Sequence, residues 1–97
     1  MKKVMLVCNA GMSTGMLAKK IQEASNGTME VKAYGEAEYM QYADDVDMIL
    51  VGPQIRHLLP SIKASVSCPV QSIPPQHYGM MNGKAVYDEI VKVIGKE

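Results

Sequence analysis

A cysteine near the start of the chain is followed by a run of mostly small residues. Cys8 ends an apolar segment, and a helical pattern begins at about Ser13 or Thr14. Small residues let backbone N–H groups turn inward together, and the start of a helix adds the positive end of its dipole. Both effects favour a bound anion and a thiolate. The predicted phosphate cradle beside Cys8 comprises Asn9, Ala10, Gly11, Met12, Ser13, Thr14 and Gly15.

Each of these two features also has an ordinary structural explanation. A buried cysteine often acts only as a small hydrophobic residue, and a strand-to-helix turn needs no ligand. Their adjacency favours function, because perturbed nucleophiles cluster at active sites. The loop is not a nucleotide-binding P-loop, since no Gly-Lys-Ser/Thr follows it, and no second cysteine lies at redox spacing from Cys8.

A cysteine beside a phosphate cradle can serve either a phosphatase or a phosphoryl carrier. Small tyrosine phosphatases have an arginine six residues after the cysteine and an aspartate elsewhere that protonates the leaving group. Here Thr14 stands at that distance, the only arginine is Arg56, and no acidic residue lies between Pro74 and Asn82. The site can hold a phosphoryl group on sulfur but lacks the usual parts for hydrolysis, which favours a carrier.

Two alternatives stay open at this point. The first is a small cysteine-dependent phosphatase or arsenate-reductase-like enzyme, disfavoured by the missing arginine and acid. The second is a non-catalytic anion-binding or receiver-like module. A receiver needs aspartates at the strand ends, where this chain has Cys8.

Short apolar runs alternate with helical patterns along the chain. The apolar runs predict strands at residues 3–7, 29–34, 48–51 and 70–73. Helices are expected from about 13 to 24, over 36–43, over 60–65 and from about 83 to 94, with residues 74–79 as a loop. Met40 should face inward, and the last helix should bury Val86, Ile90 and Val93.

This alternation predicts an α/β fold with a parallel sheet. The strand at 29–34 is the most polar and should lie at an edge, whereas those at 3–7 and 48–51 are apolar and central. The expected order is 2-1-3-4, a flavodoxin-like three-layer domain with helices on both faces. Ligands of such sheets bind beyond the carboxyl ends of the strands, where the strand order reverses, and Cys8 stands there.

Composition narrows the class of protein further. The 97 residues, 47% of them hydrophobic, suit a single domain over residues 1–97. Lys+Arg and Asp+Glu number 10 each, so the formal net charge is zero and does not indicate a nucleic-acid partner. No apolar run approaches the roughly 18 residues of a membrane span. Two cysteines and no zinc-like spacing suggest the reducing cytoplasm, with no metal and no cofactor. Asp44, Asp45 and Asp47 are expected to be solvated rather than metal ligands.

The segments that follow the third and fourth strands should border Cys8. Gln54 and Tyr78 are candidates for contacts with phosphate or with a partner, and Tyr78 could equally be a packing residue. His57 and His77 could relay phosphate, although a histidine in a loop usually has no such role. Cys68 precedes the fourth strand at the opposite edge of the sheet and is expected to be structural.

Nine methionines accompany a complete absence of Phe and Trp. Most fall on apolar strand or helix positions, where they fill the core. Met16 is expected to do the same. Met12, Met80 and Met81 lie near the predicted site, where flexible apolar side chains suit docking to successive partners.

Three segments of the chain together resemble the enzyme IIB component of the bacterial sugar phosphotransferase system, in its lactose/cellobiose/chitobiose branch. The likeness covers essentially the whole chain and departs at Gly15, where a second serine is expected. The segments are Val7-Cys8-Asn9-Ala10-Gly11-Met12-Ser13-Thr14, Leu50-Val51-Gly52-Pro53-Gln54-Ile55 and Leu58-Leu59-Pro60, with the pair Tyr78-Gly79 after the fourth strand.

The resemblance implies a phosphoryl relay. A phosphohistidine on a IIA partner would donate its phosphoryl group to the thiolate of Cys8, with residues 9–15 as the cradle. Phosphocysteine would then pass the group to a sugar of the cellobiose, lactose or chitobiose class, bound to the membrane IIC permease. The protein would be a cytoplasmic phosphotransferase that docks transiently at the inner face of the cell membrane.

Overall fold

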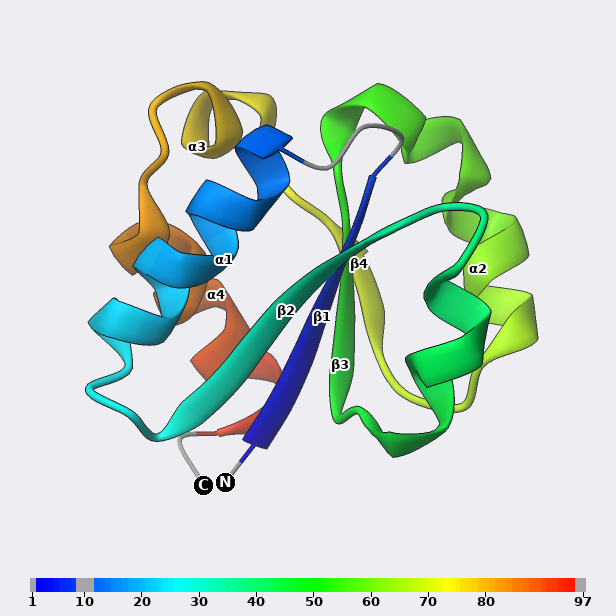
Figure 1. Ribbon diagram of the computed structural model, residues 1–97, viewed down its shortest axis with the longest axis horizontal. Helices are drawn as coiled ribbons and strands as arrows, with labels where there is room; N and C mark the ends of the chain where they lie inside the picture. Colours follow the sequence, from blue (N-terminus) through cyan, green and yellow to red (C-terminus); the bar gives the residue numbers. More distant parts are fainter. Residues whose placement is uncertain (1, 9–11, 96–97) are drawn as a thin grey trace.

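The computed structural model describes residues 2–8 and 12–95, in which one four-stranded parallel sheet lies between two layers of helices (Figure 1). The elements alternate as the sequence predicts, which confirms the α/β fold. In chain order they are β1 (Lys2–Cys8), α1 (Met12–Ala24), β2 (Met29–Gly35), the 3₁₀ helix η1 (Tyr39–Asp45), β3 (Met48–Val51), the 3₁₀ helix η2 (Pro53–Leu58), α2 (Leu59–Ser65), β4 (Val70–Ser72), α3 (Pro75–Gly79) and α4 (Gly83–Ile94).

The strands lie in the order β2-β1-β3-β4, which confirms the predicted order 2-1-3-4. Within the sheet, Leu6 of β1 pairs with Ala33 of β2 on one side and with Leu50 of β3 on the other. β1 and β3 are central because their apolar side chains are buried on both faces, whereas β2 carries the exposed Lys32 and lies at an edge.

Two separate hydrophobic cores cover the two faces of the sheet, because successive side chains of a strand point to opposite faces. Even-numbered residues of β1, such as Leu6, pack with α1 and α4 in the first core. Odd-numbered residues, such as Met5, pack in the second core with η1, η2 and α2. Figure 1 shows α1, α3 and α4 to one side of the sheet and α2 to the other.

The first core depends on a close approach of α4 to α1. Gly83 begins α4 and is buried, and the preceding Asn82 caps the helix by accepting a hydrogen bond from the Ala85 N–H at 3.1 Å. A Cβ on Gly83 would lie 2.6 Å from the carbonyl carbon of Lys20 and 2.8 Å from the backbone nitrogen of Ile21. Glycine at position 83 therefore sets how closely α4 packs on the helix that begins beside Cys8.

Side chains cover part of the outer edge of β2. Three of its backbone N–H groups donate to side-chain oxygens rather than to a further strand. The pairs are Met29 with Ser25 Oγ at 3.3 Å, Val31 with Gln22 Oε1 at 2.9 Å, and Gly35 with Glu38 Oε1 at 3.4 Å. Much of the edge of the sheet is thereby occupied by the chain itself.

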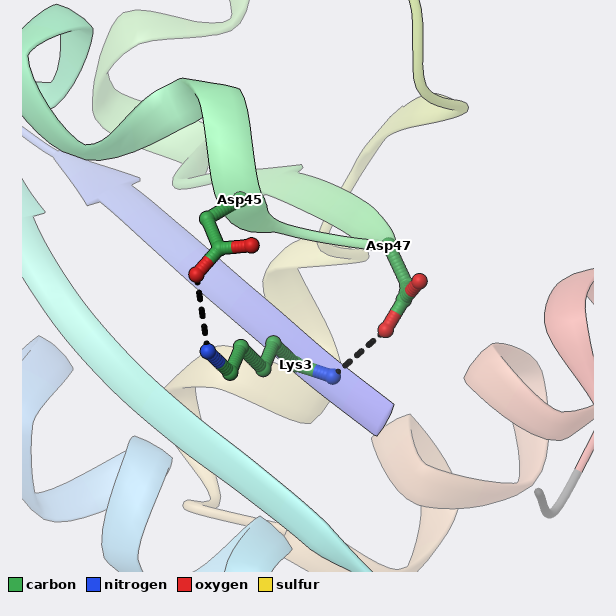
Figure 2. Close-up of polar contacts among 3 residues, drawn as sticks. All are labelled: Lys3, Asp45 and Asp47. Atoms are coloured by element: carbon green, nitrogen blue, oxygen red, sulfur yellow. Dashed lines mark hydrogen bonds and ion pairs between the residues drawn. The ribbon is translucent and has the colours of Figure 1, made fainter. Parts of the chain in front are cut away.

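Lys3 joins β1 to the segment that leads into β3 (Figure 2). Its Nζ lies 2.8 Å from Asp45 Oδ2, and its backbone N–H donates to Asp47 Oδ2 at 2.8 Å. The hydrogen bond and the opposite charge raise the pKa of Lys3 and lower the pKa of Asp45. Two of the three aspartates that were expected only to be solvated thus have a structural contact, although Asp45 stays largely exposed.

Two predicted segments differ in extent from the structure. Residues 74–79, predicted as a loop, contain α3, which begins at Pro75, where the missing proline N–H costs nothing. The helix expected over 36–43 begins only at Tyr39, which is buried with Ala43, so Met40 points outward and is 53% exposed.

The buried stripe of α4 also differs from the expected one. Val86 and Ile90 are buried as predicted, but Val93 is 37% exposed. Ile94 packs against the first core instead, which continues the four-residue spacing of the stripe.

Candidate functional site

Cys8 is the last residue of β1, at the carboxyl edge of the sheet, and it is only 1% exposed. Its carbonyl oxygen accepts a hydrogen bond from the Glu36 N–H at 2.9 Å, and the Val7 oxygen accepts from the Gly52 N–H at 2.8 Å. Strand alternation places Cys8 on the same face as Leu6, where α1 packs. The thiol is therefore fixed between β2 and β3, where the strand order reverses.

The helix α1 begins at this edge of the sheet, close in sequence to Cys8 (Figure 1). It starts at Met12, earlier than the predicted 13 or 14, so the stretch from Met12 to Gly15 belongs to its first turn rather than to a loop. That turn carries no acidic side chain, so no carboxylate of its own opposes the positive end of the helix dipole. The first N–H groups of a helix have no partner within the helix and can bind an anion, so a phosphate site at this turn stays a prediction.

Much of the predicted cradle lies outside the described residues. Residues 9–11, and the side chains of Met12, Ser13 and Thr14, lie outside the described residues. Gly15 is exposed, and a Cβ there would meet nothing within 4 Å. A serine would therefore fit at this position without steric conflict.

Gly52 follows β3 and lies directly against Cys8. A Cβ at position 52 would lie 3.1 Å from the Cβ of Cys8 and 3.0 Å from Oε1 of Gln54. The φ of Gly52 is −63°, an ordinary value for any residue, so space rather than backbone conformation favours glycine there. Oε1 of Gln54 therefore lies close to Gly52, whereas the contact of Gln54 with phosphate or with a partner stays a prediction.

The segment after β4 contributes the other predicted residues. Tyr78 lies in α3 and packs, partly buried, against the first core, in keeping with its interpretation as a packing residue. His77 is half-buried in the same helix, and its Nδ1 makes no hydrogen bond with any residue that the structure describes. Arg56 and His57 lie on η2, and both are exposed.

Two methionine side chains are strongly exposed on elements that begin at the carboxyl edge. Met16 of α1 is 59% exposed, so its assignment to the core is wrong. The buried stripe of α1 runs through Leu17 and Ile21 instead, which turns position 16 outward. Met80, after α3, is 78% exposed, and Met81 packs partly against the first core.

Cys68 lies far from these residues in the topology. It precedes Pro69 and β4, at the amino edge of the sheet, as predicted. Partial burial raises the pKa of its thiol, which disfavours the thiolate. The described chain thus places one cysteine at each end of the sheet.

A cavity of about 280 Å³ lies away from Cys8, between β1, β2 and η1. Lys3, Lys32, Tyr34, Tyr42 and Asp45 are among its lining residues. Neither cysteine nor histidine is among its lining residues, and its lining belongs to β1, β2, η1 and the residue that follows η1 rather than to the segments after the strand ends. The carboxyl edge, rather than this cavity, is the candidate site.

No helix in residues 2–8 and 12–95 has the length and apolar character needed to cross a membrane.

The carboxyl edge of this doubly wound parallel sheet has a cysteine at the end of one strand and a helix that begins soon after it in the sequence. Comparison with known proteins assigns the chain within that class. The profile of the family described as "PTS system, Lactose/Cellobiose specific IIB subunit" matches residues 3–89, and the chain belongs to this family.

Characterised relatives carry several different sugar names. The oligo-beta-mannoside-specific EIIB component of Bacillus subtilis is 29% identical, over 97% of both chains. The galactose-specific and the cellobiose-specific EIIB components of two Lactococcus lactis subspecies are each 34% identical, over 88% of this chain and 89% of theirs. Members of this family are phosphotransferases of sugar uptake, so this chain is a sugar phosphotransfer component.

Solved structures confirm the fold. The lactose-specific IIB domain of Streptococcus pneumoniae superposes with a TM-score of 0.79 at 18% identity, over 95% of this chain and 96% of that one. The cellobiose-specific IIB protein of Borrelia burgdorferi gives a TM-score of 0.70 at 27% identity, over 96% and 91%. The predicted flavodoxin-like, four-stranded arrangement is therefore that of solved IIB domains.

Sequence reasoning missed the steric role of Gly52. In the sequence Gly52 stands out only as part of a motif, and a Gly-Pro pair after a strand ordinarily indicates a turn. A sequence signal did exist, because position 52 follows a central strand beside the one that ends in Cys8. The close approach of the two residues becomes evident only in three dimensions.

Proposed function

We propose that Cys8 accepts a phosphoryl group from the phosphohistidine of a IIA partner and passes it to a sugar bound to the membrane IIC partner. The observation that supports this proposal is that β1 ends at Cys8, at the carboxyl edge of the sheet, and that α1 begins four residues later, at Met12. A nucleophilic sulfur and a set of backbone donors for phosphoryl oxygens then lie together, at the edge where this class of sheet binds ligands.

The first transfer needs little beyond position and charge. The Cys8 thiolate attacks phosphorus in line with the bond to the imidazole nitrogen, the S–P bond forms, and the N–P electron pair returns to the imidazole. Charge builds on the three other phosphoryl oxygens, and N–H groups of residues 9–15 are the donors that we assign to them.

The second transfer reverses the role of sulfur. A sugar hydroxyl attacks phosphorus, the O–P bond forms, and Cys8 leaves as the thiolate. The hydroxyl proton passes to a base of the IIC site or to water. Thiolate is the leaving group at neutral pH without protonation, so this chain needs no general acid, in keeping with the absence of acidic residues between Pro74 and Asn82.

Partner docking belongs at the carboxyl edge, because the phosphoryl group must be reached there. Met16 and Met80 present flexible apolar side chains at this end of the molecule, and Tyr78 lies close to Met80 in sequence. Such side chains can repack against two different surfaces in turn. We place the protein in the cytoplasm, docked transiently at the inner face of the membrane through IIC.

The sugar belongs to the class named for the relatives, which includes cellobiose, galactose and oligo-β-mannosides. The galactose-specific and cellobiose-specific relatives are equally similar to this chain. Sequence identity therefore does not indicate which sugar is transported, and we assign the choice of sugar to the IIC partner.

The test is mass spectrometry of the protein incubated with phosphoenolpyruvate and the upstream relay proteins, including IIA. The parent protein should gain about 80 Da, the mass of a phosphoryl group. Cys68→Ser should gain the same mass and serves as the matched control, whereas Cys8→Ser should gain none. A phosphoryl adduct on Cys8→Ser, or its loss from Cys68→Ser alone, would overturn the assignment to Cys8.

A further inference from the structure

The space beside Cys8 is shared by a glycine and a glutamine side chain. The point that a Cβ of residue 52 would occupy is 3.1 Å from the Cys8 Cβ and 3.0 Å from Gln54 Oε1. The side chain of Gln54 therefore folds back from the start of η2 over Gly52, towards the end of β1. Glycine at position 52 leaves this path open.

The Gln54 amide is available for a ligand. The residue is exposed, and its side-chain amide makes no hydrogen bond with any residue that the structure describes. Rotation about its terminal carbon–carbon bond exchanges Oε1 and Nε2, so the two-donor –NH₂ group can occupy the same point next to Gly52, which itself lies against Cys8. A donor at that point would approach from the segment that follows β3, whereas α1 belongs to the segment that follows β1.

We propose that Gln54 donates a hydrogen bond to an oxygen of the phosphoryl group on Cys8, and that Gly52 keeps the path for this contact open. This inference rests on the proposed function. The amide gives up no proton: the N–P bond to the donor imidazole breaks, the S–P bond forms, and Gln54 stabilises charge on a phosphoryl oxygen throughout.

A neutral donor suits a carrier better than a cation. The phosphoryl group must be accepted from one partner and released to another. Phosphocysteine must therefore not be stabilised so strongly that transfer to the sugar becomes slow. An amide contributes less to binding a phosphate than the charged, two-pronged contact of an arginine. Gln54 thus supplies orientation without the strong binding that would retard release.

Three variants and one control separate a donor from a packing residue. Gln54→Leu removes the donors at similar size, and Gln54→Glu replaces them with a carboxylate that repels the phosphoryl group. Gly52→Ala places a methyl group on the path of the side chain. The control is Gln76→Glu, which adds the same charge to an exposed residue of α3, beyond the carboxyl end of β4.

The rate of phosphorylation by phospho-IIA is the first measurement. We expect a loss of about tenfold for Gln54→Leu and a larger one, on the order of 100-fold, for Gln54→Glu, since hydrogen bonds to charged groups are the stronger kind. Gly52→Ala should fall between the parent and Gln54→Leu, and Gln76→Glu should stay within about twofold of the parent. A residue that only packs would give similar losses for Leu and Glu.

The second measurement is the ¹H–¹⁵N signal of the Gln54 side-chain amide, assigned by its loss in Gln54→Leu. It should shift when Cys8 is phosphorylated, whereas the Gln76 pair should not. An unshifted Gln54 pair, with rates for both Gln54 variants equal to the control, would overturn this inference and leave Cys8 as the acceptor. A parent protein that takes up no phosphoryl group would overturn the proposed function and this inference with it.

Discussion

Replacing Gly83 with alanine is expected to destabilise the protein by forcing α4 away from α1. The new Cβ would lie 2.6 Å from the carbonyl carbon of Lys20, and ordinary contact begins at 3.4 Å, so the helices must separate locally by about 0.8 Å. The atoms in the way are mainly backbone, and they cannot rotate aside as a flexible side chain would. Overpacking of this kind typically costs about 1–3 kcal/mol.

The gain in helix propensity offsets part of this cost. Alanine is favoured over glycine by about 1 kcal/mol in a helix interior and by less at the first helical position, where Gly83 stands. The free energy of unfolding should therefore fall by about 1–2 kcal/mol, which lowers Tm by about 5–15 °C for a chain of this size.

Urea unfolding followed by circular dichroism at 222 nm measures the effect. The control is Gly79→Ala, at the end of α3, where a Cβ would meet nothing within 4 Å. That variant should stay within about 0.5 kcal/mol of the parent. If Gly83→Ala unfolds at the same urea concentration as the parent and the control, the two helices are not limited by contact at this glycine.

Three further predictions concern charge and chemistry. Asp45→Asn should lower the free energy of unfolding slightly at neutral pH. Because the pKa of Asp45 is depressed, the difference from the parent should vanish as the pH falls below the ordinary value of 3.8 and through the lowered pKa. Urea midpoints that differ equally at all pH values would contradict this expectation. Lys3 has a raised pKa, so the same contact should persist below 10.5 and be lost only at still higher pH; the exposed pair should also weaken in high salt. The parent protein should release negligible nitrophenol from p-nitrophenyl phosphate, since it lacks the arginine and acid of a phosphatase, whereas turnover that disappears in Cys8→Ser would favour a phosphatase.

The sheet order and the place of Cys8 could be predicted from sequence because both follow from polarity along the strands. The apolar β1 and β3 had to be central, and the more polar β2 had to lie at an edge. With that order, the residue after β1 necessarily falls where the strand order reverses. These features depend on many residues at once, so single exceptions do not change them.

The errors lie where one residue or one turn decides the outcome. A helix as short as α3 shows too little periodicity to be distinguished from a loop, especially when it begins at the second of two prolines. The apolar character of Met16 predicts the core, and a three-residue step from Ile90 predicts the same for Val93, but the buried stripes pass through the neighbouring positions and turn both outward. The tight contacts at Gly52 and Gly83 join segments distant in sequence, and no local pattern reveals them.

The covered edge of β2 affects how this protein can meet others. An open strand edge invites a second chain to add a strand through a row of backbone hydrogen bonds, and such an attachment is difficult to undo. Here side chains from α1 and the flanking turns already occupy the N–H groups of Met29, Val31 and Gly35. A carrier of the kind proposed must dissociate from each partner within a single round of transport. Because this edge of β2 is largely covered, we expect its partners to bind through side-chain contacts at the Cys8 end, which can form and break quickly.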